Sequence, residues 1–234
     1  MCISVAGFAQ NDPPKKEPLK IIPEYRFNIS YAKNLDVGVQ HLETGFTTDL
    51  LNIFDKKLRF GFGVRMGAQY NQNLDFTTAH ANLKSTPSSV DTMHISNAAS
   101  VAFNLYGNVE FALRKRIAIG VNVDFIGIST GLKAKGQFKP GKESTNQGFE
   151  IKNNVEIYPT AANAFTLYNS KGCLYNQAYI RIEPSRKFGI RLGLAYLNQE
   201  FSTNESVGVH NAYRFEYNTW GFMAGITFNN FNEK

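Results

Sequence analysis

Apolar and polar residues alternate strictly along residues 56–70, which read KKLRFGFGVRMGAQY. One set of positions is apolar or aromatic and comprises Leu58, Phe60, Phe62, Val64, Met66, Ala68 and Tyr70. The other set is glycine, arginine and one amide, at Arg59, Gly61, Gly63, Arg65, Gly67 and Gln69. A period of two sustained over this length predicts a β-strand with two chemically different faces.

The glycines decide which of the two faces points inward. Glycine on a solvent-exposed strand covers nothing and loses more conformational entropy on folding than any other residue. It is well suited to a crowded interior, where a neighbouring side chain must pass. We therefore expect the glycine and arginine face to line a narrow interior and the apolar face to point outward. This reversal of the usual soluble pattern predicts a transmembrane β-barrel.

The same arrangement recurs twice later in the chain. RKRIAIGVNVDFIGIS begins at Arg114 and SRKFGIRLGLAYLNQ begins at Ser185, and each places a basic turn before an alternating, glycine-bearing strand. The other expected strands fall within 24–33, 44–57, 101–116, 174–187 and 217–231. The expected fold class is therefore all-β, an eight-stranded antiparallel up-and-down transmembrane β-barrel built from repeated hairpins.

The connections between these strands alternate in length. Short basic turns are expected at 55–57, 114–116 and 185–187, and much longer loops on the other side. Outer-membrane barrels have short turns in the periplasm and long loops outside the cell. Residues 131–173 are long enough to contain another hairpin within FEIKNNVEIYPTAANAFTLY, so a ten-stranded barrel is the alternative.

The amino-terminal residues divide the chain into three expected segments. Residues 1–9 are interpreted as the remnant of a signal peptide, with small residues at Gly7 and Ala9 before Gln10. Residues 10–23 are rich in proline and lysine and are expected to be a flexible lead-in to a barrel at 24–231. If Cys2 leaves with the signal, Cys173 stands alone and no intramolecular disulfide can form.

Composition narrows the classes of protein that remain. No stretch approaches the roughly 18 continuous apolar residues of a membrane helix, which excludes a helical membrane protein. The net charge of +6 would suit a nucleic-acid partner. However, the basic residues are scattered and no nucleic-acid-binding motif is present, so no such partner is expected.

These features together resemble the small outer-membrane β-barrel proteins of Gram-negative bacteria. The resemblance rests on the segment ending FAQ, the glycine-alternating strands after basic turns, and the aromatic last strand YNTWGFMAGITFNNF. The nearest groups are the PorT-like and the OmpA- or OmpW-like barrel families. The resemblance covers residues 24–231 and is one of pattern, without a diagnostic motif. It implies an exported protein located in the cell outer membrane.

The most informative candidate site is a set of charged residues on the faces expected to point inward. Its members are Arg59, Arg65, Arg181, Arg191, Glu110, Asp124 and Glu183. We interpret them as a paired structural network that fills the barrel, because eight strands enclose space only for side chains. The alternative is a path for an ion or substrate lined by charge. Arg26 and Asp49 extend the set, and Tyr106, Tyr175 and Tyr179 are expected to occupy the remaining cross-section.

The histidines are the other candidates for chemistry. His41, His80, His94 and His210 are expected in or beside extracellular loops, where Asp75, Asp91 or Glu205 could join them in a metal site or an acid–base pair. No HExxH, CxxC or GxSxG motif accompanies them. GFGVRMG has no helix after it, so it is not expected to hold a phosphate. We expect no catalytic residue, no cofactor and no metal.

The sequence favours a non-enzymatic outer-membrane barrel with long extracellular loops, acting in envelope structure, secretion and assembly, or surface interaction. Its expected partners are outer-membrane lipid and lipopolysaccharide, together with other envelope proteins that contact the loops. Two alternatives remain open. One is a narrow pore or small-molecule carrier of the OmpW type, which needs an apolar inner wall. The other is a soluble calycin-like barrel whose faces are the reverse of those expected.

Overall fold

The structure is a computed structural model that describes residues 24–34, 38–54, 57–79, 90–165, 170–208 and 212–230. Within these ranges the chain forms one sheet of eleven strands and one short helix. The expected signal remnant at 1–9, the lead-in at 10–23 and residue 231 lie outside the described residues, as do His80 and His210.

The described strands vary from three to 23 residues in length. They are β1 (Glu24–Lys33), β2 (Gln40–Ile53), β3 (Leu58–Thr78), β4 (Thr92–Arg114), β5 (Ile117–Gly131), β6 (Ala134–Lys139), β7 (Lys152–Pro159), β8 (Ala162–Ala164), β9 (Leu174–Ile182), β10 (Phe188–Val207) and β11 (Ala212–Asn230). Helix α1 (Lys142–Asn146) lies between β6 and β7. Among the described residues, no helix combines the length and the apolar character needed to cross a membrane.

Eight of the strands close into a barrel, which we call the eight-strand ring. Going round it, β1, β2, β3, β4, β5, β9, β10 and β11 each pair antiparallel with the next, and β11 pairs with β1 to close the circle. The predicted all-β, eight-stranded antiparallel barrel is confirmed. The ten-stranded alternative is wrong, because β6 and β7 pair with each other outside this ring.

The two faces of these strands point as the alternation predicts. On β3, Phe62 is 54% exposed and Met66 is 50% exposed, whereas Arg65 is 3% exposed. Leu174 is an exception, because it was expected on the outer face and is buried at the start of β9. It follows Gly172, whose φ is 79°, and the buried run Cys173 to Tyr175 comes before the regular alternation of the strand.

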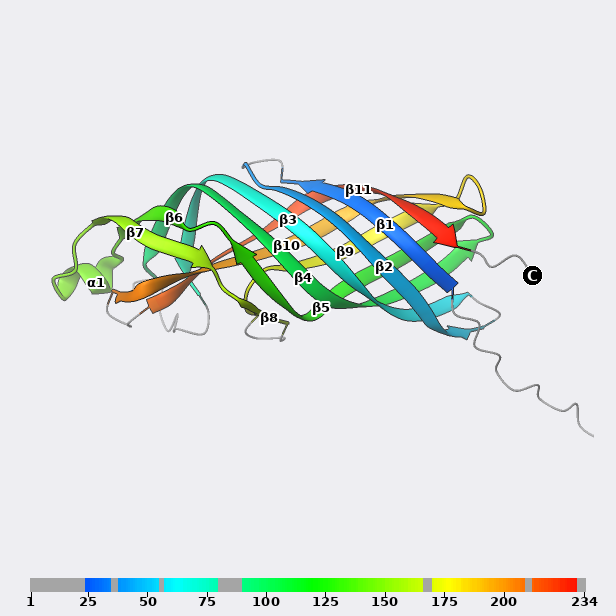
Figure 1. Cartoon of the computed structure of the whole chain (residues 1–234), viewed down its shortest axis with the longest axis horizontal. Coiled ribbons are helices and arrows are strands. Elements are labelled where there is room, and N and C mark those ends of the chain that lie inside the picture. Colours follow the sequence, from blue (N-terminus) through cyan, green and yellow to red (C-terminus); the bar gives the residue numbers. More distant parts are fainter. Residues whose placement is uncertain are drawn as a thin grey trace, which may run out of the picture.

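Four long strands continue past the eight-strand ring and exchange partners to form a second, narrower barrel. β3 leaves β2 and pairs with β11, and β4 leaves β5 and pairs with β6. β10 leaves β9 and pairs with β7, which pairs with β6. The result is a closed ring of β3, β4, β6, β7, β10 and β11, which we call the six-strand ring. In Figure 1, β6, β7 and α1 lie at one end of the molecule, and the carboxyl-terminal end of β11 lies at the other.

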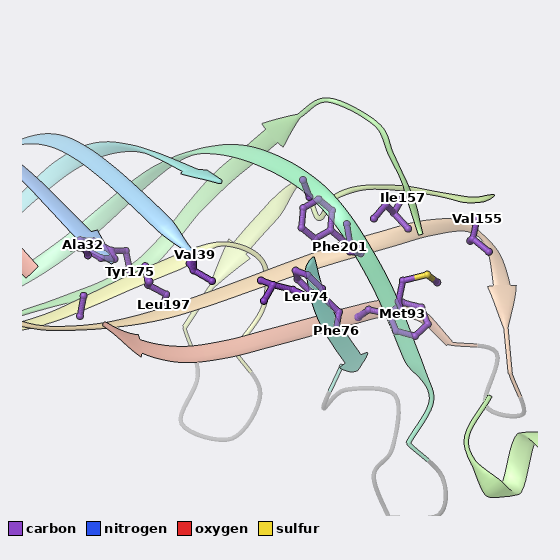
Figure 2. Close-up of a cluster of buried hydrophobic side chains, with 14 of the residues drawn as sticks. Ala32, Val39, Leu74, Phe76, Met93, Val155, Ile157, Tyr175, Leu197 and Phe201 are labelled. Carbon is purple, nitrogen blue, oxygen red and sulfur yellow. The ribbon is translucent and has the colours of Figure 1, made fainter. Parts of the chain in front are cut away.

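The six-strand ring has an apolar interior, unlike the eight-strand ring. Its fully buried side chains include Phe76, Met93, Ile95, Phe138, Ile157, Phe201 and Phe215. The rings of Phe76 and Phe201 meet edge to face with centroids 5.3 Å apart. Figure 2 shows this cluster continuing along the axis to Leu197, Val39 and Tyr175 in the eight-strand ring.

A break in the alternation marks the change from one interior to the other. In β3, Gln72 and Asn73 are exposed in succession, and Asn73 has a φ of 52°. The inward positions move from the odd residues up to Asn71 to the even residues from Leu74 onward. Opposite them in β4, Ser96 and Asn97 are also exposed in succession. Because a one-residue slip exchanges the two faces of a strand, these breaks turn apolar side chains inward.

The packing of the six-strand ring gives a first prediction. Phe76→Ala should lower the free energy of unfolding of this ring by about 3–5 kcal/mol, because it leaves a cavity among buried aromatic rings. Gln72→Ala, on the exposed face of the same strand, should change it by less than about 0.5 kcal/mol. Hydrogen exchange at the Thr78–Phe215 pairing would measure the difference. Equal protection in both variants would contradict the assigned core.

Candidate functional site

The candidate site is the polar interior of the eight-strand ring. The structure places all seven residues of the expected charge set there: Arg59, Arg65, Arg181, Arg191, Glu110, Asp124 and Glu183. The side chains of Arg59 and Glu183 keep 19% and 18% of their surface, and the other five are buried. Arg26 and Asp49 are buried beside them. The set forms two clusters at different heights along the axis.

Glu110 is the centre of the first cluster, at the end with the short turns. Its Oε2 accepts hydrogen bonds from Arg26 Nη1 at 2.8 Å and from Arg181 Nε at 2.9 Å, and Arg181 Nη2 donates to its Oε1. Arg26 also pairs with Asp49. Arg59 Nη1 lies 3.6 Å from Glu110 Oε1 at the ring's edge. Glu110 thus pairs with three guanidinium groups, with bidentate geometry toward Arg181, and Asp49 and Glu183 supply further negative charge to the cluster.

Arg65 is the centre of the second cluster, farther into the barrel. It pairs with Asp124, and its Nη1 lies 3.2 Å from Glu43 Oε2. Its guanidinium lies over the Tyr106 ring at 4.7 Å from the centroid and over the Tyr175 ring at 5.1 Å. Cation–π contacts of this kind strengthen when water is excluded. Arginine suits the position because its flat group can stack on rings and bind carboxylates at its edge.

A chain of amides connects the two clusters. Arg26 Nη2 donates to Asn108 Oδ1 at 3.0 Å, and Asn108 Nδ2 donates to Asn122 Oδ1 at 2.6 Å. Asn122 Nδ2 then donates to Gln177 Oε1 at 2.7 Å. Gln177 Nε2 donates to Glu43 Oε1 at 2.6 Å. Buried polar groups are costly unless they are hydrogen-bonded, and this chain supplies partners for the side-chain amides of Asn108, Asn122 and Gln177.

The inward glycines are the reason that large side chains fit in this lumen. A Cβ atom at Gly63 would lie 2.6 Å from Tyr106 Cζ, and a Cβ atom at Gly120 would lie 2.6 Å from Tyr179 Cζ. At Gly67, it would lie 2.6 Å from His41 Cε1. The expectation that inward glycines make room for tyrosines is confirmed. Glycine is needed at these positions for space.

Two interior residues were missed or misplaced from the sequence. Glu43, which accepts from Ser30 and Gln177 and pairs with Arg65, was not expected in the set. His41 was expected beside an extracellular loop, but it is buried on β2 and stacks on Tyr175 with centroids 4.0 Å apart. The reason is that β2 begins at Gln40, earlier than expected. The alternation of Leu42, Thr44 and Phe46 with His41, Glu43 and Gly45 carried that signal.

The remaining candidates for chemistry do not come together. His94 Nδ1 lies 2.7 Å from Asp75 Oδ1 on the outer surface of the six-strand ring. Asp91 is buried and accepts from the Gly141 backbone N–H at 2.7 Å, which holds the segment before α1. Glu205 pairs with Lys152, which lowers the pKa of the Glu205 carboxyl. Among the described residues, no group of three potential ligands could hold a metal ion.

A small cavity lies in the interior of the eight-strand ring beside the second cluster. Its volume is about 10 Å³, and its lining includes His41, Arg65, Gln69, Cys173 and Tyr175. That volume matches about one water molecule. Cys173 is buried there, with Sγ 3.7 Å from Ser100 Oγ.

Beyond the second cluster, the polar filling continues to the base of the six-strand ring. Gln199 accepts from Gln69 at 3.1 Å and donates to Ser100 at 2.8 Å. Arg214 Nη2 then donates to Glu200 Oε2 at 2.6 Å, and this hydrogen bond raises the pKa of the Arg214 guanidinium. The geometry of the whole interior supports neutralised charge and close filling, and it brings no nucleophile and base together among the described residues.

Comparisons with known proteins gave matches in structure only. No family model matches the chain, and no curated protein matches it in sequence. The solved structures similar to it include the Yersinia pestis outer membrane protein Ail in a phospholipid bilayer nanodisc, at 10% identity and a TM-score of 0.36, covering 89% of this chain and 100% of Ail. Ail in complex with the heparin analogue sucrose octasulfate matches at 11% identity and a TM-score of 0.32, covering 88% of this chain and 96% of Ail. A Pseudomonas aeruginosa FadL homologue matches at 9% identity and a TM-score of 0.22, covering 88% of this chain and 88% of the homologue.

The first cluster gives a second prediction. Glu110→Ala should lower the free energy of unfolding by about 3–5 kcal/mol, because Arg26 and Arg181 would keep their buried charges without this carboxylate. Glu183→Ala, at the partly exposed edge of the same cluster, should lower it clearly less, because Arg181 keeps its hydrogen bonds to Glu110. Urea unfolding in detergent or lipid would measure both. A Glu110→Ala variant as stable as Glu183→Ala would show that the cluster does not need its central carboxylate.

Proposed function

We propose that this chain is a non-enzymatic β-barrel protein of a Gram-negative outer membrane. In this proposal its lumen is closed, and its six-strand ring and the connections at that end form a contact surface outside the cell for envelope structure, secretion and assembly, or surface interaction. The expected long loops are in large part strands, since β10 runs to Val207 and β11 begins at Ala212. The observation that carries the proposal is a belt of exposed apolar side chains around a charged, buried interior. Soluble barrels have the opposite arrangement, so the belt argues against the calycin-like alternative.

The belt has the dimensions of a membrane-spanning surface. On β3 its outward residues run from Leu58 to Tyr70, about 40 Å along the strand at ~3.3 Å per residue, or about 28 Å along the axis at a tilt near 45°. The apolar band of transmembrane barrels is about 25 Å tall and is flanked by aromatic girdles. Tyr70, Tyr31 and the Tyr196–Trp220 pair, whose centroids are 5.1 Å apart, provide aromatic groups toward one edge.

The two ends of the barrel suggest its orientation. At one end, the tight turns after β4 and β9 expose Lys115, Arg116, Arg186 and Lys187. At the other end the six-strand ring extends beyond the belt. Short turns lie in the periplasm and longer connections outside the cell in outer-membrane barrels. We therefore place the basic turns in the periplasm and the six-strand ring outside the cell.

The proposed partners follow from these surfaces. The belt would contact outer-membrane lipid and lipopolysaccharide, and the loops and the six-strand ring would contact other envelope proteins. Nucleic acid is not a proposed partner, because the basic residues are scattered along the chain and no nucleic-acid-binding motif is present. The proposal includes no catalytic activity, since the described histidines lie apart, His41 inside the eight-strand ring and His94 on the outside of the six-strand ring.

A narrow carrier of the OmpW type is the second candidate function. The apolar interior of the six-strand ring favours it, because such a carrier needs an apolar inner wall. That interior is packed with side chains, however, including the rings of Phe138 and Phe215 at 6.4 Å between centroids. The charge clusters below it also fill the lumen of the eight-strand ring. A closed barrel is therefore the leading proposal.

The closed lumen gives a third prediction. The purified protein in planar bilayers should show no stable conductance steps, because Tyr106, Tyr175, Tyr179 and the paired charges occupy the cross-section. Single-channel recording would test this, with a large porin in the same bilayers as the positive control. Steady, reproducible single-channel currents from the wild type would make the carrier or pore the leading function.

The belt gives a fourth prediction, which tests the membrane proposal itself. Phe62→Arg should weaken folding into lipid vesicles by about 2–4 kcal/mol, because Phe62 lies near the middle of the belt. Phe62→Leu is the matched control and should fold like the wild type. Folding is measured by heat-dependent gel mobility and protease protection in vesicles. A wild-type chain that remains monodisperse without detergent and does not insert into vesicles would contradict the outer-membrane proposal.

A further inference from the structure

An open, polar hollow lies on the outer surface of the six-strand ring, on the side formed by β4, β6 and β7. Its volume is about 630 Å³. All of its lining residues except Gly136 have polar side chains, and the lining consists of His94, Ser96, Asn97, Lys135, Gly136, Gln137, Asn153 and Asn154. We propose that this hollow binds the phosphorylated sugar headgroup of a glycolipid in the outer leaflet. The inference rests on the proposed membrane location and adds a specific site to it.

Two breaks in the strand pattern supply the polar groups. In β7, Asn153 and Asn154 both stand opposite the single residue Gln137 of β6, because the register shifts between Gly136 and Phe138. This is a β-bulge, and both asparagine side chains are exposed. Asn154 has a φ of 58°, a left-handed conformation that asparagine tolerates better than most residues. Backbone outliers of this kind often mark binding sites.

The second break forms the opposite edge of the hollow. Ser96 and Asn97 of β4 are exposed in succession, where regular alternation would bury one of them. Tyr70 donates a hydrogen bond from its hydroxyl to Asn97 Oδ1 at 2.8 Å. Tyr70 is the outermost belt residue on β3, so this bond places the hollow directly beyond the apolar belt. A lipid with its acyl chains along the belt would bring its headgroup to this level.

Hydrogen bonds within the lining hold these groups in place across four strands. Asp75 of β3 bonds His94 Nδ1 at 2.7 Å, and Gln137 Nε2 of β6 donates to Asn153 Oδ1 of β7 at 2.7 Å. His94 and Gln137 are register partners between these two bonds. Each amide carries both donors and an acceptor. The bond between them uses Gln137 Nε2 and Asn153 Oδ1. Gln137 Oε1 and Asn153 Nδ2 form no hydrogen bond with another described residue, so they can bind a ligand.

The chemistry of the lining indicates the class of ligand. Amide and hydroxyl side chains match the alternating donors and acceptors of sugar hydroxyl groups. Lys135 forms no ion pair among the described residues, although it stands opposite Glu156, which binds Lys133 at 3.3 Å. Its ammonium group is therefore free to bind a phosphate by a charge-assisted hydrogen bond. A sugar that carries phosphate fits both features.

The test uses the full chain folded in detergent micelles and purified lipopolysaccharide as the probe. The wild type should bind it, and Lys135→Gln with Asn153→Ala should weaken binding by about tenfold or more, because a charge-assisted and a neutral hydrogen bond are lost. Lys139→Gln is the matched control, since Lys139 lies on the same strand and the same side, outside the hollow. It should weaken binding by less than about twofold.

Two further arms identify the source of the ligand. Phosphatidylglycerol micelles, which carry phosphate without sugar, should not compete, and deacylated lipopolysaccharide should bind more weakly than the intact glycolipid. Equal weakening by Lys139→Gln, or full competition by phosphatidylglycerol, would reduce the site to diffuse charge attraction and overturn it. An unaffected double variant would place binding elsewhere. A deacylated saccharide that binds as tightly as the glycolipid would make a soluble glycan the ligand. Failure of the membrane proposal is a different result, because the wild-type chain would then stay monodisperse without detergent before any ligand is added.

Discussion

The narrow lumen of the eight-strand ring requires every charge inside it to be neutralised within a few ångströms. Eight strands enclose room for side chains and little else, and an unpaired buried ion carries a penalty of several kcal/mol. Glu110 and Arg65 meet this requirement as the centres of two clusters, each surrounded by groups of opposite charge. The inward glycines follow from the same requirement, since only they leave space for Tyr106 and Tyr179.

The two rings solve the problem of burial in opposite ways with the same four strands. In the eight-strand ring, polar groups are inside and the apolar belt is outside. In the six-strand ring, apolar groups are inside and polar groups outside. The exchange occurs at Asn73 in β3 and at Ser96 and Asn97 in β4, where the alternation breaks. Such breaks let one strand cross between two surroundings that favour opposite faces.

Most of the eight-strand ring could be predicted from the sequence, because an uninterrupted period of two records both faces of a strand. The seven charged residues were placed by that period alone, residue by residue. Glu43 and His41 were missed because the loop before β2 is short and the strand begins earlier than its apolar residues suggested. The six-strand ring was missed for a different physical reason. It depends on three exchanged pairings, β3–β11, β4–β6 and β7–β10, of which the first joins residues as far apart as Thr78 and Phe215. No local sequence pattern records such a change of partner.

The change of partners also affects the order of assembly. β11 pairs with β1 to close the eight-strand ring, and its other end pairs with β3 to close the six-strand ring. Both closures bring together segments that are separated by most of the described chain, and such non-local contacts form late because their loop-closure entropy must be overcome first. Until β11 arrives, β1 and β3 both keep open hydrogen-bonding edges that could pair with another chain. A single strand therefore closes two open edges, and with them two places where another chain could pair.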